Sequence, residues 1–200
     1  MRHVARKRAP KGFSLAVTTP GNQWLTNNGF DLAKPLPPKT LPPPLWRKYI
    51  PKMHLKYQGI CAYLGVYMEP AIGGISIDHF IAKSSRASGT YDWKNYRLAC
   101  SMVNSKKGVF DGILDPFTLP DVPELFHLEL GSGRIFVNPL ITGNLSLAAS
   151  QTIKTLGLDR ALCRAMRARH FRYYTEGLTK SSLKEFSPFV YSECERQGLL

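Results

Sequence analysis

Alternation of apolar and polar residues predicts a short β-strand over residues 74–81. A second strand is predicted over residues 92–100, and the polar residues 82–91 form the loop between the two strands. Ser101 follows directly and is a residue type preferred at helix N-termini, so we expect a helix to begin there. The pattern predicts strand, loop, strand and helix in direct succession.

The C-terminal half of the chain has more regular patterns. Residues 125–138 contain two β-rich runs joined by Gly131-Ser132-Gly133, which predicts a hairpin. Residues 144–158 predict a helix that ends at Gly157. Together with the first strands and helix, these elements predict an α+β fold.

A further helix is expected after Asp159, which we predict to be its cap, and a last helix after Ser187, with Pro188 at its first position. In the helix after Asp159, basic residues are expected on one face and apolar residues on another. The basic face consists of Arg160, Arg164 and Arg167, and the apolar face of Leu162, Ala165, Met166 and Tyr173.

The N-terminal part, residues 1–44, is predicted to be an extended arm. It is basic at its start and proline-dense at residues 34–44, a composition that favours polyproline II. The arm is either a partly ordered tail or a segment that contacts a phosphate backbone or a partner protein. Residues 45–115 are expected to form the functional core and residues 116–200 an extension packed on that core.

The charge balance suggests the kind of partner. The chain has 27 Lys and Arg against 14 Asp and Glu, a net charge of +13, with a pI of about 9.8. Such an excess attracts polyanions, and nucleic acid is favoured over a membrane because no apolar run approaches membrane-spanning length. No secretory signal is recognised, and the four dispersed cysteines are expected to be reduced thiols in a cytoplasmic protein.

The residues with the strongest chemical interest form an ordered series. Asp78-His79 ends the first predicted strand, Asn95 lies on the second, and Asn104 lies on the following helix with Lys107-Gly108 behind it. A histidine titrates near neutrality and can accept a proton from water. Asp78 and Asn104 offer hard oxygen ligands that suit Mg²⁺.

These residues give the chain a resemblance to the HNH endonuclease family. The family pattern runs C-x-Y-C-G, D-H-x-x-P-x-S, W-x-N-x-x-L-A-C and x-x-C-N-x-x-K-G. The matching stretches, in the same order, are CAYLG (61–65), IDHFIAKS (77–84), DWKNYRLAC (92–100) and SMVNSKKG (101–108). The sequence is similar to the variant with asparagine in the third place, as in the HNH domain of RNA-guided DNA nucleases.

The resemblance implies a ββα-metal fold and an endonuclease that hydrolyses phosphodiester bonds in DNA with Mg²⁺, for which Mn²⁺ can substitute. His79 is then the general base, Asp78 and Asn104 hold the metal, and Asn95 keeps the His79 loop in place by hydrogen bonds. Lys107, Lys83 and Arg97 are candidates for phosphate contact, although each has the alternative of an ordinary solvated side chain.

The sequence departs from the family at its zinc knuckle. Two C-x-x-C pairs would hold a structural zinc, but Leu64 and Val103 replace one cysteine of each pair beside Cys61 and Cys100. We therefore expect no structural zinc. The other histidines are expected to be ordinary structural or surface residues; these are His3, His54, His127 and His170.

A weaker resemblance extends beyond the core. Residues 111–139 and the following TIKTLGLDR (152–160) are similar to stand-alone HNH nucleases of bacterial anti-phage defence systems of the Septu and retron-associated types. This implies an ATPase or sensor protein as a partner. A phage or restriction-type HNH nuclease would look much the same, an effector acting on RNA is a further alternative, and a non-catalytic nucleic-acid-binding module on an HNH scaffold is the alternative outside the enzymes.

Overall fold

The computed structural model describes residues 1–120 and 124–200; residues 121–123, which fall within the stretch used for the weaker resemblance, lie outside the described residues. The fold mixes helices with two small antiparallel sheets, as predicted for an α+β protein. Strand β1 (Ile75–His79) pairs with β2 (Tyr96–Cys100), and β3 (Phe126–Glu129) pairs with β4 (Arg134–Val137). The helices are α1 (Thr19–Asn27), α2 (Ile50–Lys56), α3 (Ser101–Lys107), α4 (Gly143–Leu156), α5 (Ala161–Thr175), α6 (Lys180–Phe186) and α7 (Pro188–Arg196).

The predicted succession of strand, loop, strand and helix is confirmed. In the β1–β2 pair, Ile75 lies opposite Cys100 and His79 lies opposite Tyr96. Helix α3 begins at the residue after β2 and packs against both strands. The second strand is shorter than predicted, because residues 93–95 form a 3₁₀ turn before it begins.

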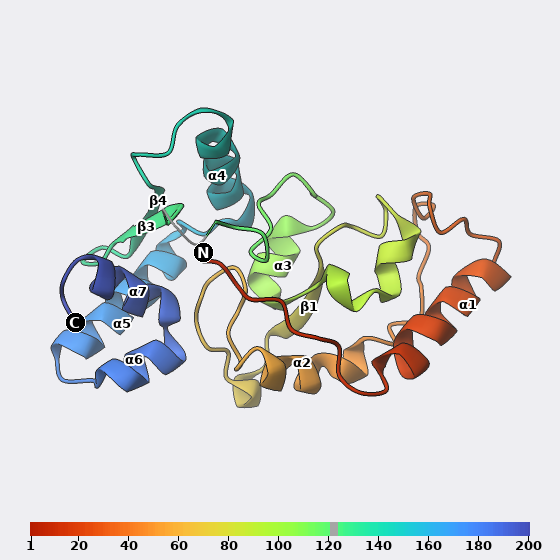
Figure 1. Cartoon of the computed structure of the whole chain (residues 1–200), viewed down its shortest axis with the longest axis horizontal. Coiled ribbons are helices and arrows are strands. Elements are labelled where there is room, and N and C mark those ends of the chain that lie inside the picture. The colour runs from red at the N-terminus through yellow and green to blue at the C-terminus, as the bar shows by residue number, and fades with distance from the viewer. Residues whose placement is uncertain (121–123) are drawn as a thin grey trace.

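The N-terminal segment, residues 1–44, was predicted to be an extended arm, but residues 14–27 within it are helical. Residues 14–18 form a turn of π-helix that continues directly into α1, and Phe13, Val17 and Leu25 are buried in the core. Figure 1 shows the first residues starting near the C-terminal helices and crossing the central part of the molecule toward α1. Hydrogen bonds hold this segment in place, since the Val4 amide donates to the Pro116 carbonyl and the Trp93 indole donates to the Lys7 carbonyl.

Glycine is needed in α1 because an aromatic ring lies directly against its backbone. A Cβ built on Gly21 would lie 2.3 Å from the Tyr91 ring, closer than real Cβ atoms approach other heavy atoms. Tyr91 is fully buried and its hydroxyl donates to the Pro43 carbonyl. The contact joins the N-terminal helix to the loop between β1 and β2.

The C-terminal part confirms the predicted hairpin and the helix that ends at Gly157, whose backbone is left-handed at φ 63°. Asp159 does not cap α5 with its side chain, which was the prediction. Its carboxylate instead accepts from the Ile135 amide and pairs with Arg164, so it links α5 to the hairpin. Figure 1 shows α5, α6 and α7 gathered with the hairpin at one end of the molecule, opposite α1.

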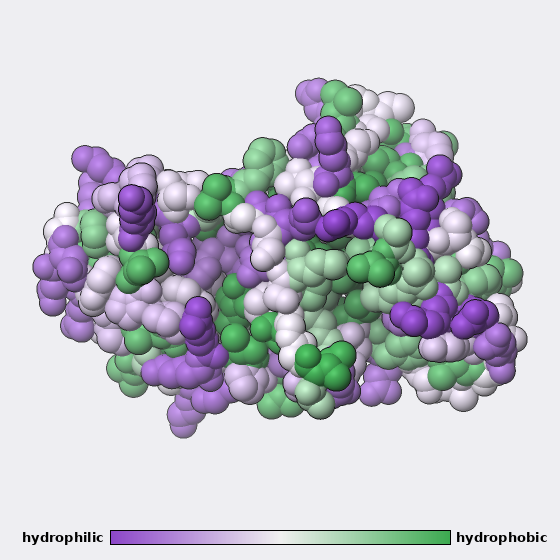
Figure 2. All heavy atoms as spheres, turned by 180° about the vertical axis from the view of Figure 1, so that it is seen from behind, coloured by the Kyte–Doolittle hydropathy of each residue, from purple (hydrophilic) through white to green (hydrophobic). Residues whose placement is uncertain are grey.

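One hydrophobic cluster connects all parts of the chain. It includes Met1 and Phe13 from the N-terminal segment, Leu98 from β2, and Phe189 and Cys194 from α7. On the face in Figure 2, hydrophobic residues break a largely hydrophilic surface at several places, which is ordinary for a folded protein. The three predicted segments of the chain therefore share one core.

Candidate functional site

His79 ends β1 with its ring held between aromatic side chains. The ring centroid lies 4.7 Å from that of Trp46 and 5.0 Å from that of Tyr96, both in edge-to-face arrangements. Its Nε2 lies 2.9 Å from the Thr90 carbonyl oxygen. Burial lowers the pKa of His79 from its usual 6.5 to about 4. The imidazole is therefore neutral at neutral pH.

The contact with Thr90 determines which nitrogen of His79 carries the proton. A carbonyl oxygen can only accept a hydrogen bond, so Nε2 of the neutral ring must be the donor. The lone pair is then on Nδ1, which makes no hydrogen bond within the described residues. This tautomer is the one that a general base requires, with one nitrogen held and the other able to accept a proton.

Asn95 holds the loop that follows His79. Its Oδ1 accepts from the Ile81 amide at 2.8 Å, and its Nδ2 donates to the carbonyls of Ile81 and Gly89 at 2.9 Å each. The Phe80 amide also donates to the Asn95 carbonyl. These hydrogen bonds are of the kind that the sequence predicted for Asn95, and they tie both ends of the loop to the start of β2.

Asp78 is buried and already has two partners. Its Oδ2 accepts a short hydrogen bond from the Tyr63 hydroxyl, and its Oδ1 lies 3.2 Å from the Lys107 ammonium nitrogen. Burial raises the pKa of Asp78, although Lys107 and the Tyr63 hydrogen bond oppose the rise. Sequence reasoning assigned no role to Tyr63, although it occupies the tyrosine of the family pattern at residues 61–65.

Lys107 is an internal residue and does not face solvent as a phosphate contact would. Its side chain is fully buried, and its ammonium donates to the His79 carbonyl at 2.9 Å as well as pairing with Asp78. It therefore ties the end of α3 to the end of β1. The prediction that Lys107 contacts phosphate does not hold for this arrangement, because no face of the ammonium is open.

Arg97 is also withdrawn from solvent, with only 2% of it exposed. Its guanidinium forms a two-pronged ion pair with Asp115, with nitrogen–oxygen distances of 2.8 and 2.5 Å. It also lies over the ring of Phe117, 3.9 Å from the centroid. Asp115 lies eighteen residues downstream of Arg97, so nothing near Arg97 in the sequence indicated this ion pair.

Of the three residues predicted to contact phosphate, Lys83 is partly exposed to solvent and lies near His79, unlike the buried Lys107 and Arg97. Its ammonium lies 5.1 Å from the Trp46 ring centroid, and Trp46 in turn contacts His79. Burial, followed by the charge of Arg47, lowers the pKa of Lys83. Arg47 is exposed and was missed by sequence reasoning, because it lies in a helical turn outside the motif. Two cationic side chains thus lie on the Trp46 side of His79.

Asn104 lies one turn before Lys107 on α3 and faces β1. Its Nδ2 donates to the Ser76 hydroxyl at 3.2 Å and points toward the Ile77 carbonyl at 3.4 Å. Its side-chain oxygen, Oδ1, accepts no hydrogen bond within the described residues. The structure therefore brings Asn104 against the same strand that carries Asp78 and His79.

The positions that the sequence resemblance aligned with a zinc knuckle form part of the core. Cys61, Leu64 and Val103 are buried together, and the Cys100 amide donates to the Cys61 sulfur at 3.4 Å. The hydrogen bond with Cys61, reinforced by burial, raises the pKa of the Cys100 thiol. A Leu and a Val thus pack where the family has further cysteines.

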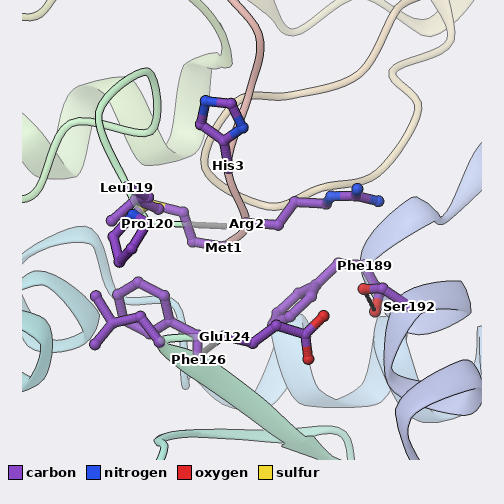
Figure 3. Close-up of a pocket in the computed structure, with 10 residues that line it drawn as sticks. Met1, Arg2, His3, Leu119, Pro120, Glu124, Phe126, Phe189 and Ser192 are labelled. Atoms are coloured by element: carbon purple, nitrogen blue, oxygen red, sulfur yellow. Dashed lines mark hydrogen bonds between the residues drawn. The ribbon is translucent and has the colours of Figure 1, made fainter. Parts of the chain in front are cut away.

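A second group of side chains, which could hold a metal ion, lies at the C-terminal end. Ligand atoms of Glu124, His127 and Glu193 lie within 4.8 Å of one another. Figure 3 shows the Glu124 carboxylate beside a small cavity of about 50 Å³. Sequence reasoning treated His127 as ordinary, because Glu193 lies far away in the chain. Arg196 already neutralises Glu193 through contacts of 2.8 and 3.0 Å, and this cation opposes metal binding.

His170 gives a prediction for the pH dependence of stability. Burial, with a smaller effect of Arg169, lowers its pKa to about 4. The unfolded chain therefore binds a proton on His170 below about pH 6.5, the ordinary histidine pKa, while the folded chain stays neutral down to about 4. Stability should fall as the pH drops through this window. Urea unfolding at pH 7 and 5 should show a smaller loss of stability for His170→Gln than for the wild type; an equal loss would contradict a partly buried, neutral His170.

Comparison of the sequence with protein-family models and with curated proteins found no match. Among the described residues, no helix is both long and apolar enough to cross a membrane. Function is therefore inferred from the side chains at the end of β1.

Proposed function

We propose that the protein is a Mg²⁺-dependent endonuclease of the HNH type that hydrolyses phosphodiester bonds in DNA. The observation that carries the proposal is the His79 ring, neutral and held at Nε2 by the Thr90 carbonyl with Nδ1 unbonded. Hydrolysis needs a base of this kind, because water must lose a proton as it attacks phosphorus. The adjacent Lys83 and Arg47 are cations that can attract the phosphate.

The donor types at the end of β1 fit Mg²⁺. Asp78 and the unbonded amide oxygen of Asn104 are the residues that would hold the ion. A carboxylate has about four acceptor directions, and Tyr63 and Lys107 use two of those on Asp78. When bound, Mg²⁺ would stabilise negative charge on the departing oxygen. The Lys107 ammonium lies against the same carboxylate and opposes a second cation, so binding is expected to weaken the Lys107–Asp78 contact.

Each residue of this chain then has a defined task. His79 accepts the water proton at Nδ1, and Thr90 keeps the ring in the productive tautomer. Asn95 holds the loop that carries Lys83, so that the base and the phosphate contact keep their relative positions. The family resemblance implies 5′-phosphate and 3′-hydroxyl products, and a defence-system effector controlled by an ATPase or sensor partner is the biological setting that we propose.

The second candidate is a non-catalytic nucleic-acid-binding module. The Asp78–Lys107 ion pair favours it, because a buried lysine neutralises the carboxylate that would hold the metal. Binding of DNA in EDTA, with no cleavage under Mg²⁺ or Mn²⁺, would support this alternative.

The proposed activity is tested by cleavage of supercoiled plasmid DNA with Mg²⁺, with an RNA substrate in parallel. His79→Ala should lower the cleavage rate by about 10²–10⁴-fold, the usual contribution of a general base. His170→Gln is the matched control, since it replaces a partly exposed histidine of α5, at the other end of the molecule, and it should cleave like the wild type at neutral pH. Cleavage by purified His79→Ala at the wild-type rate would refute the assignment, and faster cleavage of RNA would change the substrate.

A further inference from the structure

A wide hollow on the surface lies away from His79. It has a volume of about 830 Å³ and is lined by three segments distant in sequence. These are the N-terminal residues 2–5 and 7, residues 54–61 with Gly65 and Tyr67, and helix α6 with Pro188. Figure 1 shows α2 and α6, two of the elements whose residues line it. We call it the α2–α6 groove. None of the residues proposed for catalysis lines it.

The α2–α6 groove carries an excess of positive charge. Four cationic side chains line it, against a single acid, Glu185. The cations are Arg2, Lys7, Lys56 and Lys184. Within residues 1–120 and 124–200, the three lysines make no ion pair, so their charges are not neutralised by the protein. Lysines gathered in a concave surface attract a polyanion more strongly than the same charges spread over a convex one.

The groove also contains a partly exposed aromatic ring. Tyr67 is 38% exposed and is held in place by an edge-to-face contact with His54, whose ring centroid lies 5.5 Å away. His54 is itself fixed by a 2.8 Å hydrogen bond between its Nε2 and the Met68 carbonyl. Gly59 allows this packing, since a Cβ there would lie 2.4 Å from the Tyr67 ring. A supported, partly exposed tyrosine is a platform on which a base can stack.

We propose that the α2–α6 groove binds a single strand of nucleic acid, with Lys56 and Lys184 on its phosphates and Tyr67 against a base. A basic groove combined with an aromatic platform is the arrangement that binds single strands without sequence preference. A duplex fits less well, because its bases are already stacked and offer no free face. The inference rests on the proposed function for its choice of nucleic acid, and it adds an anchoring site remote from the catalytic residues.

Binding is tested in the full chain carrying His79→Ala, in EDTA, so that no cleavage interferes. The probe is a fluorescent oligothymidylate of about twelve nucleotides, within the site sizes of single-strand binders, followed by anisotropy at several salt concentrations. Lys56→Glu combined with Lys184→Glu should weaken binding at least tenfold and lower the salt slope by about 1.4, since each phosphate contact on a single strand contributes about 0.7. Tyr67→Leu should weaken binding about fivefold or more.

Lys11→Glu combined with Lys154→Glu is the matched control, because it makes the same charge change at exposed sites outside the groove. It should weaken binding less than threefold. Equal losses in the groove and control variants would overturn the proposal, as would equal affinity for a duplex of the same length or tighter binding to polyglutamate. If the wild type binds the oligonucleotide as expected but cleaves no plasmid, the proposed nuclease activity fails and the groove proposal stands. If the wild type cleaves plasmid but the groove variants bind the oligonucleotide as tightly as the wild type, the groove proposal fails and the nuclease proposal stands.

Discussion

Replacing Asp78 by alanine is expected to lower the free energy of unfolding by about 3–5 kcal/mol, the usual cost of removing one partner from a buried ion pair. The Lys107 ammonium would keep only the His79 carbonyl as a partner in a fully buried position. The Tyr63 hydroxyl, also buried, would lose its acceptor. Urea unfolding followed by circular dichroism measures the loss.

Two further variants separate charge from packing. Asp78→Asn keeps an acceptor for Tyr63 and Lys107 but removes the negative charge, so it should cost less than alanine. Adding Lys107→Met to Asp78→Asn should recover part of that loss, because the unpaired buried charge is gone. Lys106→Met, on the exposed side of α3, is the control and should change stability by less than about 0.5 kcal/mol. If the free energy of unfolding of Asp78→Ala lies within about 1 kcal/mol of the wild-type value, an ordinary effect for a single substitution, the buried ion pair is refuted.

The stability role of Asp78 affects how its variants can be used to study function. An inactive Asp78→Ala protein could be inactive because the end of β1 has loosened, since Lys107 links that end to α3. His79→Ala is the cleaner test, because His79 makes one side-chain hydrogen bond and its loss leaves no buried charge unpaired. Metal binding at Asp78 should therefore be measured directly, by calorimetry with Mg²⁺ or Mn²⁺ on the wild type and on folded Asp78→Asn.

Local patterns predicted the elements that carry the candidate site. β1 alternates apolar and polar residues, although its adjacent residues Ile77 and Asp78 are both buried, and α3 follows β2 without a loop, so both elements are visible in a short window of sequence. The loop-holding hydrogen bonds of Asn95 could also be anticipated, because they span only short distances along the chain. The partners of Lys107 and Arg97 could not, because periodicity treats every cation as an exposed residue.

Helix α5 shows the same limit. Its arginine face was expected to be separate from its apolar face, yet Arg167 is buried while Leu162 is 77% exposed. The Arg167 guanidinium donates to the carbonyls of Gly133 and Leu158, which come from the hairpin turn and the end of α4. These carbonyls satisfy the hydrogen-bond donors of the buried guanidinium, and the Asp159 carboxylate, 4.0 Å away, offsets part of its charge. No pattern within one helix contains that information.

The N-terminal segment was mispredicted for a different reason. The prediction rested on the basic start of the chain and the proline-dense residues 34–44. Residues 14–27 gave no signal against it, since they include three threonines, a proline and a glycine, which are weak helix formers. Burial of Val17 and Leu25 and the close packing of Gly21 against Tyr91 stabilise the helix instead. Tertiary contacts decide helix formation where propensity is low.

Replacing Asp115 by alanine is expected to destabilise the fold by about 3–5 kcal/mol, because it leaves the Arg97 guanidinium buried without its carboxylate. Arg97 would keep hydrogen bonds to the Lys94 and Tyr96 carbonyls at 2.8 and 3.0 Å and its contact with the Phe117 ring. These neutral partners do not balance a full charge. The Asp115 carboxylate also accepts from the Phe117 amide, so the turn that it begins would loosen as well.

The surface pair of Asp31 and Lys34 is the matched control for this variant. Its two charges lie 3.6 Å apart on side chains that are 52% and 76% exposed, so Asp31→Ala should cost less than about 1 kcal/mol. The difference between the two aspartates should persist in 0.5 M salt, roughly a regime in which exposed pairs are screened and buried ones are not. Equal costs for the two variants would show that Arg97 reaches solvent, which would restore it as a candidate for phosphate contact.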